Sequence, residues 1–270
     1  MNSKYAQINK EKFGPWAVVT GASSGIGKEF ARQLAANGLN VVLVARRLPL
    51  LEEVGRKLAK EFGIQYRAVQ VDLAEDGFLK DIDAATRDLD VGLLISNAGT
   101  GKPGKFLSFE EEEQKRFVRL NALSHLSLTH YFGRRLAKRR KGGVLLTGAM
   151  GATDGVPFMA SMAGSKALLL SLGKSLHYEF KELGLNITVL ITTPTDTPIV
   201  PLLGFDKDTM PMKPISVQQC VYEALTALRA NRVSVMPGLK FRIANKLVPE
   251  SISRKVTGDL MKKNNGIVWG

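Results

Sequence analysis

Apolar runs of strand length alternate with longer helix-like segments along most of the chain, and this alternation limits the folds open to it. Strands that alternate with helices imply βαβ units and a parallel sheet. The runs are apolar almost throughout, as in a sheet that helices cover on both faces. The sequence therefore predicts one doubly wound α/β domain. The expected strands are residues 16–22, 41–45, 66–72, 91–96, 143–148, 185–191 and 233–238.

The expected helices lie between these strands, and one of them has a recognisable start. Ser108 and Glu111 in "SFEE" form a capping-box pattern, which predicts that a long helix begins there. We expect an N-terminal extension over residues 1–13, the main domain over 14–240 and a basic, amphipathic appendage over 241–270. The other expected helices are residues 27–38, 48–63, 78–90, 217–232 and the segment that contains Lys166.

A glycine-rich turn, "VVTGASSGIG", joins the first strand to the first helix. Gly21, Gly25 and Gly27 allow a tight turn and a close approach of the backbone to a pyrophosphate. The start of the helix then offers unpaired N–H groups and a partial positive charge to the anion. A plain glycine-rich turn would have the same composition, so the interpretation depends on the rest of the chain.

Further landmarks follow in order, and together with the turn they resemble the short-chain dehydrogenase/reductase family, whose fingerprint is TGxxxGxG. "VDL" resembles the element whose aspartate contacts the adenine edge, and "NAG" resembles the motif at the end of the fourth strand. Asn121 and Lys166 fall where the family has its active-site asparagine and the lysine of Tyr-x-x-x-Lys. The resemblance covers residues 14–240 and implies a Rossmann-type fold, a nicotinamide cofactor, an oxidoreductase activity and a homo-oligomer. The cofactor-binding residues that it implies are Gly21, Ser23, Ser24, Gly25, Ile26, Gly27, Arg46, Arg47, Asp72, Leu73, Asn97, Ala98, Gly99, Lys166, Pro194 and Thr195.

Two arginines stand where such folds choose between NAD(H) and NADP(H). Folds that use NAD(H) have an acid after the second strand to bind the ribose 2′-hydroxyl, whereas those that use NADP(H) supply an arginine. Here the strand runs into Ala45, Arg46 and Arg47, so no carboxylate repels a 2′-phosphate and two cations can pair with it. Unless the arginines are only surface charges, they favour NADP(H).

Two side chains that carry the family's chemistry are missing. Met162 stands four residues before Lys166 in place of the proton-transferring tyrosine, and a thioether cannot donate a proton. Ala149 stands in place of the serine that bonds the carbonyl oxygen. The expected catalytic residues are therefore Asn121, for a water, and Lys166, for the nicotinamide ribose.

Other hydroxyl groups close to these positions in the sequence could substitute for the missing donors. Thr147 is two residues before Ala149, and so on the same face of the strand, while Thr153 lies in the loop that follows. Ser161 adjoins the tyrosine position but is a poor acid. The sequence leaves open whether either threonine reaches the pocket.

Three interpretations of the altered site stay open. The protein could be an NADP(H)-dependent oxidoreductase for a substrate that needs no tyrosine, such as an imine, which already carries its proton, or an activated alkene. It could be a catalytically inactive NADP(H)-binding sensor or the partner subunit of an active relative. It could also be an engineered variant, although the changes spread over "GAMGATDG", "MAGSK" and "ITTPTDTP" rather than two positions.

The expected substrate is an apolar small molecule. Residues 198–214 mix prolines with apolar residues where the family has its substrate-binding loop, although packing on the core would explain them equally well. Met150, Phe158, Met159 and Met162 would add soft, adaptable walls.

The formal net charge of +13 would suit a polyanion, a phosphorylated cofactor, an anionic membrane or simply a solvated surface. No nucleic-acid motif or basic stripe with interleaved aromatics is present, so we expect no nucleic-acid partner. The appendage, "LKFRIANKLVPESISRKVTGDLMKKNN", could cover the site, dock a partner subunit or lie on an anionic membrane. Packing on its own domain is the plainest interpretation.

A cytoplasmic location and the absence of a metal are the last expectations. The polar N-terminus lacks the apolar core of a signal peptide, and no run approaches the roughly 18 apolar residues of a membrane span. Cys220 is the only cysteine, which fits a reducing compartment. His125, His130 and His177 have no metal-ligand partners at useful spacing.

Overall fold

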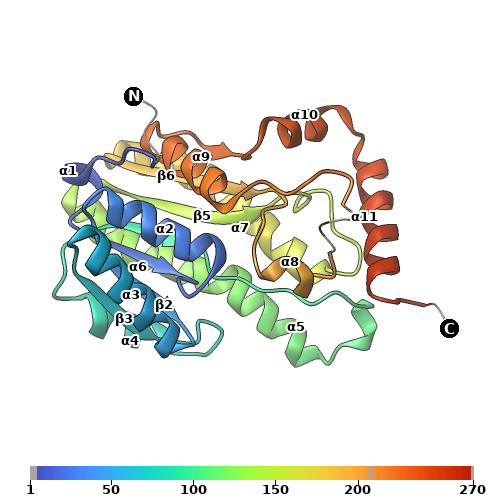
Figure 1. Cartoon of the computed structure of the whole chain (residues 1–270), viewed down its shortest axis with the longest axis horizontal. Coiled ribbons are helices and arrows are strands. Elements are labelled where there is room, and N and C mark those ends of the chain that lie inside the picture. Colours follow the sequence, from blue (N-terminus) through green and yellow to red (C-terminus); the bar gives the residue numbers. More distant parts are fainter. Residues whose placement is uncertain (1–4, 206, 208–209, 269–270) are drawn as a thin grey trace.

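A parallel sheet of seven strands, in the order β3-β2-β1-β4-β5-β6-β7, forms the centre of the computed structural model, which describes residues 5–205, 207 and 210–268 (Figure 1). The chain is a single domain with helices on both faces of the sheet, which confirms the predicted doubly wound, Rossmann-type α/β fold. The strands are β1 (Trp16–Thr20), β2 (Asn40–Ala45), β3 (Tyr66–Gln70), β4 (Val91–Ser96), β5 (Gly142–Ala149), β6 (Leu185–Thr192) and β7 (Ser234–Val235).

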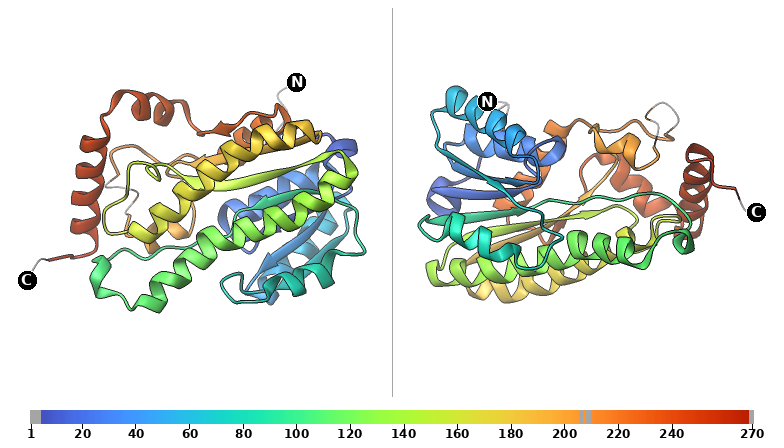
Figure 2. Two further views of the ribbon diagram at one scale, coloured as in Figure 1. Left: turned by 180° about the vertical axis from the view of Figure 1, so that it is seen from behind. Right: turned by 90° about the horizontal axis from the view of Figure 1, so that it is seen from below.

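Helices cover both faces of this sheet (Figure 2). One face carries α2 (Gly25–Ala36), α3 (Leu48–Phe62) and α9 (Val217–Arg229). The other face carries α4 (Phe78–Thr86), α6 (Ser124–Arg139) and α7 (Ala160–Glu182). The remaining helical elements are α1 (Lys10–Phe13), η1 (Phe106–Ser108), α5 (Glu111–Val118), η2 (Arg119–Leu123), α8 (Ile199–Leu202), α10 (Leu239–Leu247) and α11 (Glu250–Asn264).

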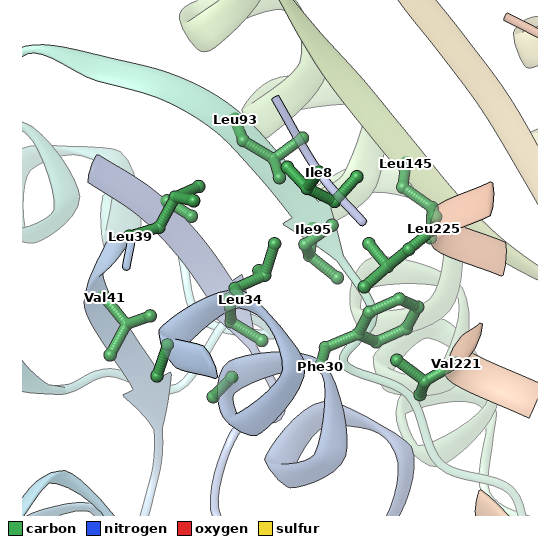
Figure 3. Close-up of a cluster of buried hydrophobic side chains, with 14 of the residues drawn as sticks. Ile8, Phe30, Leu34, Leu39, Val41, Leu93, Ile95, Leu145, Val221 and Leu225 are labelled. Atoms are coloured by element: carbon green, nitrogen blue, oxygen red, sulfur yellow. The ribbon is translucent and has the colours of Figure 1, made fainter. Parts of the chain in front are cut away.

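Two apolar clusters, one on each face of the sheet, make up the core. Successive side chains of a strand point to opposite faces, so Val41 and Leu43 of β2 join one cluster and Val42 and Val44 join the other. Phe30 of α2 lies in the first cluster, where helix residues pack against β4 and β5 (Figure 3). Strands buried on both faces explain why the sequence runs are apolar throughout.

The predicted capping box at Ser108 is wrong. Residues 106–108 form a 3-10 turn, in which the Ser108 hydroxyl donates to the carbonyl of Lys105 at 2.8 Å. Helix α5 begins only at Glu111, after Glu110, which makes no side-chain cap. A serine hydroxyl can bond either a nearby carbonyl or the N–H groups of a following helix, and here the local carbonyl prevails.

The last strand is shorter than predicted. The sequence suggested residues 233–238, but only Ser234 and Val235 pair with β6. Pro237 has no N–H to donate to a ladder, and the chain then turns at Gly238 (φ +83°) into α10.

The strand order places a crevice at the carboxyl ends of β1 and β4. The chain runs outward from β1 through β2 to β3 on one side, then crosses back and runs from β4 to β7 on the other. Ligands of open α/β sheets bind at such a switch point, outside the carboxyl ends of the strands. The glycine turn follows β1, and the "NAG" segment follows β4.

Candidate active site

The turn between β1 and α2 has the backbone of an anion cradle. Gly21 and Gly25 have φ values of +68° and +52°, in the left-handed region that favours glycine. Ser24, at the N-cap of α2, makes no side-chain hydrogen bond into the helix. The N–H groups of a first helical turn lack intrahelical partners, so this end of α2 suits a phosphate.

The end of β4 packs against this turn so closely that Gly27 has no room for a side chain. A Cβ atom there would lie 2.3 Å from the carbonyl oxygen of Gly21 and 2.8 Å from Nδ2 of Asn97. Thr20 ties the two strand ends together, because its hydroxyl accepts the N–H groups of Asn97 at 2.8 Å and Ala98 at 2.9 Å. Glycine at position 27 is therefore required by the contact itself.

Two exposed arginines border the turn. Arg46 and Arg47 follow directly after β2, and Nη2 of Arg47 donates to the Ser23 hydroxyl at 3.2 Å. Arg47 thus contacts the turn, and Arg46 is its exposed neighbour in the chain. Ile26, by contrast, directs its side chain toward the core, so it can offer a ligand only its backbone.

The "VDL" segment lies at the end of β3, where Asp72 is held on both carboxylate oxygens. Oδ1 accepts the N–H of Ala74 at 3.0 Å, and Oδ2 pairs with Nη2 of Arg116 at 2.5 Å. Arg116 also pairs with Glu75, so α5 is fastened to this end of the sheet. The side chain of Leu73 belongs to the core.

Lys166 and Asn121 meet at Gly99. A Cβ atom on Gly99 would lie 2.8 Å from Oδ1 of Asn121 and 3.3 Å from Nζ of Lys166. Nζ donates to the carbonyl oxygen of Thr147 at 2.8 Å, and only 6% of the Lys166 residue surface is exposed. Burial disfavours the charged form and lowers the pKa of Lys166 to about 7. The structure thus brings together the two residues that the sequence singled out for catalysis.

Asn121 lies in a π-helical turn, η2, that interrupts the helix expected after residue 108. Its Nδ2 donates to the carbonyls of Thr100 at 2.7 Å and Phe117 at 3.0 Å, while Oδ1 accepts the N–H of Thr100 at 3.1 Å. π-turns inside helices are rare and frequent at functional sites. This one aims the amide at the segment that follows β4.

His125 is a buried neighbour that sequence reasoning did not place in the site. Nδ1 lies 2.8 Å from the Ser96 hydroxyl, and Nε2 lies 2.8 Å from the carbonyl oxygen of Ala98. Burial, and then the positive charge of Lys166, lower the pKa of His125 to about 3, so the ring is neutral and supports the backbone after β4. No sequence signal links residues 96, 98 and 125, because only strand and helix packing brings them together.

Met162, at the position of the missing tyrosine, lies in an apolar wall. A Cβ atom on Gly101 would lie 2.6 Å from Cε of Met159, 3.1 Å from Sδ of Met162 and 3.2 Å from Cδ2 of Leu203. Ala149 is the last residue of β5 and is only partly buried. The side chain at 162 therefore packs over the segment after β4, one helical turn from Lys166.

The hydroxyl groups considered as substitutes are engaged elsewhere. Thr147 Oγ1 donates to Oδ1 of Asn97 at 3.4 Å, and Thr153 Oγ1 donates to its neighbour Asp154 at 2.8 Å. Ser161 donates to Oε1 of Gln114. Of these residues, Ser161 and Gln114 line the cavity described below and Thr147 and Thr153 do not.

All five tyrosines of the chain lie in the part that the structure describes, and none of them lines the cavity. Tyr5 packs edge-on against Phe62. The hydroxyl groups of Tyr66 and Tyr131 donate to carboxylates at 2.8 and 2.7 Å, from Glu52 and Asp83 respectively. The other two, Tyr178 and Tyr222, are exposed on α7 and α9.

An apolar cavity of about 460 Å³ opens beside Met162. Its walls come from residues 101–117 and 158–162, with Lys102 paired to Glu113 at 3.0 Å on one side. Of the predicted walls, Phe158, Met159 and Met162 line it and Met150 does not. Of the expected substrate loop, Asp206, Asp208 and Thr209 lie outside the described residues. Further lining side chains are Lys105, Phe106, Leu107, Ser108, Phe109, Gln114, Phe117, Ala160 and Ser161.

The segment after β6 lies beside the glycine turn. Thr195 is 4% exposed, and its hydroxyl donates to the carbonyl of Thr193 at 2.8 Å. The carbonyl of Pro194 accepts the N–H of Ile215 at 3.0 Å. A Cβ atom on Gly25 would lie 3.4 Å from Cγ2 of Thr197, so this segment is in contact with the cradle.

One five-residue segment links the three parts of the site. Asn97 contacts the glycine turn, Gly99 contacts Asn121 and Lys166, and Gly101 contacts the wall of the apolar cavity. A ligand that lies along residues 97–101 would therefore reach the cradle, the lysine and the cavity together. Among the described residues, no group of histidine, cysteine and acidic side chains could hold a metal ion, and no helix could cross a membrane.

The buried lysine predicts a pH dependence of stability. Between its folded pKa of about 7 and its ordinary value of 10.5, the unfolded chain holds a proton that the folded chain has released. The free energy of unfolding should therefore rise between pH 7 and pH 9, by up to about 1.4 kcal/mol per pH unit. Urea unfolding at these pH values, within the 7 to 10.5 window, measures it.

Lys166→Met should remove this rise, whereas Lys174→Met, at an exposed lysine of the same helix, should keep it. An equal rise in the Lys166→Met variant would show that the effect comes from other groups.

The chain is similar to known proteins over most of its length. A family model described as short chain dehydrogenase matches residues 15–206. The very-long-chain 3-oxoacyl-CoA reductase of Pyricularia oryzae is 37% identical over 186 residues, which are 67% of this chain and 56% of that protein. The chain thus spans little more than half the length of this relative.

Two solved structures resemble the whole fold. One, of a 7beta-hydroxysteroid dehydrogenase, has a TM-score of 0.81 at 25% identity and covers 92% of this chain and 98% of its own. The other, a short-chain dehydrogenase from Sphingobium yanoikuyae in complex with NADPH, has a TM-score of 0.78 at 25% identity and covers 95% of this chain and 98% of its own.

Proposed function

This chain belongs to the short chain dehydrogenase family, whose members are oxidoreductases that use nicotinamide cofactors, and we propose that it is an NADP(H)-dependent oxidoreductase acting on an apolar small molecule. The observation that carries the proposal is the continuity along residues 97–101 from the glycine cradle, past Lys166, to the apolar cavity. The relatives named above, an acyl-CoA reductase and a hydroxysteroid dehydrogenase, have names that point to largely apolar substrates.

The residues present fit such a cofactor, which supplies or accepts a hydride when it is bound. The first turn of α2 would bind the pyrophosphate, because its amides lack intrahelical partners and the glycines of the turn, among them Gly27 with no room for a Cβ, let the backbone come close. Arg46 and Arg47 would bind a 2′-phosphate. Lys166, whose Nζ stands beside Gly99, would donate to the ribose hydroxyls, and Asn121 would hold the backbone around them.

The substrate is proposed to be one that needs no acid from the protein. Met162 and Ala149 stand at the positions that the family resemblance assigns to its tyrosine and serine, and neither side chain can donate a proton. An iminium ion already carries its proton, and its carbon needs only a hydride. An activated alkene takes a hydride on one carbon and can take its proton from water on the next. Both classes suit the apolar walls of the cavity.

The test is the rate of NADPH oxidation with a panel of cyclic imines, enones and bulky ketones, each at the same concentration. We expect turnover of imines or enones and negligible turnover of ketones. Faster turnover of ketones than of either other class would contradict the proposed substrate class, because it would require an acid at the site.

A second candidate function is a catalytically inactive NADP(H)-binding sensor or partner subunit. The favouring observation is that none of the five tyrosines lines the cavity, so the cavity offers no other tyrosine in place of the usual acid. The two candidate functions predict different results for NADPH oxidation with the substrate panel. Tight NADPH binding with no oxidation by any member of the panel would favour the sensor, whereas oxidation by any member would favour the enzyme.

The arginine pair predicts the cofactor preference. Arg46→Ala with Arg47→Ala should weaken NADPH binding by about tenfold or more and leave NADH binding unchanged, because only NADPH carries the phosphate that the guanidinium groups pair with. Calorimetric titration of both cofactors measures this. Arg87→Ala with Arg134→Ala, at two exposed arginines of the opposite helical layer, serves as the control for net charge. Equal weakening of both cofactors would contradict the assignment.

A further inference from the structure

The last two helices, α10 and α11, form a C-terminal arm, residues 239–264, that carries unusually exposed apolar side chains. In α10, Leu239, Ile243 and Leu247 are 62%, 49% and 75% exposed. They recur every four residues and so share one face of the helix. Phe241, on another face, is buried and fixes α10 to the domain. The apolar stripe is thus held facing outward.

A second apolar stripe continues along α11. Ile252 and Val256, one helical turn apart, are 53% and 47% exposed, and Val248, in the extended link before α11, is 43% exposed. The opposite side of α11 is anchored, because Met261 is fully buried and Gly258 lies against Pro157. The arm therefore presents two outward stripes on a support that is packed against the domain.

The arm stands at the end of the molecule toward which β5 runs (Figure 2). Nη1 of Arg254 donates to the carbonyl of Asp154 at 3.0 Å, and Gly258 touches Pro157, one residue before the cavity wall begins at Phe158. Asn265, just past the arm, contacts Gly204, next to Leu203 at the site. The arm consequently lies beside the loops that border the cavity, and its apolar stripes lie on the side away from these contacts.

Positive charge surrounds these stripes. Residues 239–264 contain seven lysines and arginines and two acids, so the net charge of the arm is 7 − 2 = +5. Each of the seven cations is exposed. They are Lys240, Arg242, Lys246, Arg254, Lys255, Lys262 and Lys263.

We propose that this arm docks the protein on an anionic lipid membrane surface. Exposed apolar side chains flanked by lysine and arginine are the combination that binds a helix in the plane of such a surface. A second copy of the chain is a poorer occupant, because a two-fold interface through the arm would bring a surface of charge +5 against itself. Docking in this orientation would place the cavity near the lipid, where an apolar substrate dissolves.

The test is flotation of the full chain with vesicles of phosphatidylcholine alone and of equal parts phosphatidylcholine and phosphatidylglycerol. We expect binding to the anionic vesicles only, reversed by high salt. Leu247→Ser with Ile252→Ser and Val256→Ser should lower the partition coefficient at least about tenfold. Lys255→Gln with Lys262→Gln and Lys263→Gln should lower it about 10²-fold, at roughly fivefold per cation.

The matched control is Leu123→Ser with Leu126→Ser and Leu168→Ser, three leucines of similar exposure outside the arm. It should bind vesicles as the unchanged protein does, and a thermal melt shows that each variant is folded. Failure to bind either vesicle, equal binding to both, or an equal loss in the control would overturn the proposal. Light scattering adds a measurement of the oligomeric state. A dimer that is lost in the triple serine variant of the arm would assign the stripes to an interface with a second copy of the chain.

Discussion

Introducing Ala149→Ser together with Met162→Tyr should raise the rate of ketone reduction by about 10⁴-fold or more. A positioned general acid contributes about 10²–10⁴ and an oxyanion donor a further factor of about 10²–10³. Residue 162 lies one turn before Lys166 on α7, beside the cavity, so a phenol there would stand next to the Lys166 amino group, whose protonated form lowers the pKa of the phenol. Initial rates of NADPH oxidation with bulky ketones measure the gain.

Three comparisons make this result specific. Each single substitution should give only part of the gain, because the acid and the oxyanion donor act on the same oxygen. Leu168→Tyr, at an exposed position of the same helix, should give none. If the double variant binds NADPH but stays inert toward the whole ketone panel, the altered pocket is not compatible with a carbonyl, and the assignment of positions 149 and 162 is wrong.

Replacing Gly27 by alanine should weaken NADPH binding by at least about 10²-fold. The new Cβ would lie 2.3 Å from the Gly21 carbonyl oxygen, so the backbone of the cradle must move. Displaced amides cannot meet the pyrophosphate with the geometry that a strong hydrogen bond needs. Fluorescence titration with NADPH measures the loss, and thermal unfolding reports the accompanying decrease in stability.

Gly164→Ala is the matched control for this substitution. Gly164 lies within α7, where a Cβ would meet nothing within 4 Å, so alanine should stabilise the helix by about 0.5–1 kcal/mol and leave NADPH binding unchanged. Unaltered affinity in the Gly27→Ala variant would mean that the cofactor does not use this turn.

The layout of the fold was predictable because the central strands β1, β2, β4, β5 and β6 are buried on both faces. The apolar runs around Val42 and Leu94 are continuous, and such runs are diagnostic when helical segments separate them. The ends of helices and strands were less predictable. Ser108 bonds a local carbonyl rather than a helix start, and the strand expected over 233–238 ends at Val235, before Pro237.

In the candidate site, too, some features could be predicted from the sequence and others could not. The glycine turn was visible because its signal is local, in residues 21–27. The neutral His125, the tie from Thr20 and the π-turn at Asn121 were not, because each depends on packing between distant segments. The cavity walls likewise come mainly from 101–117 rather than from the loop expected to line it.

Binding of NADPH and NADH to the unmodified protein, followed by fluorescence titration, tests the central claim most directly. The account predicts tight NADPH binding and much weaker NADH binding, because it assigns the pyrophosphate to the turn after β1 and the 2′-phosphate to the arginines after β2, and only NADPH carries that phosphate. Absence of binding by both cofactors would contradict it, since the fold would then be used without its cofactor and the oxidoreductase proposal would fall.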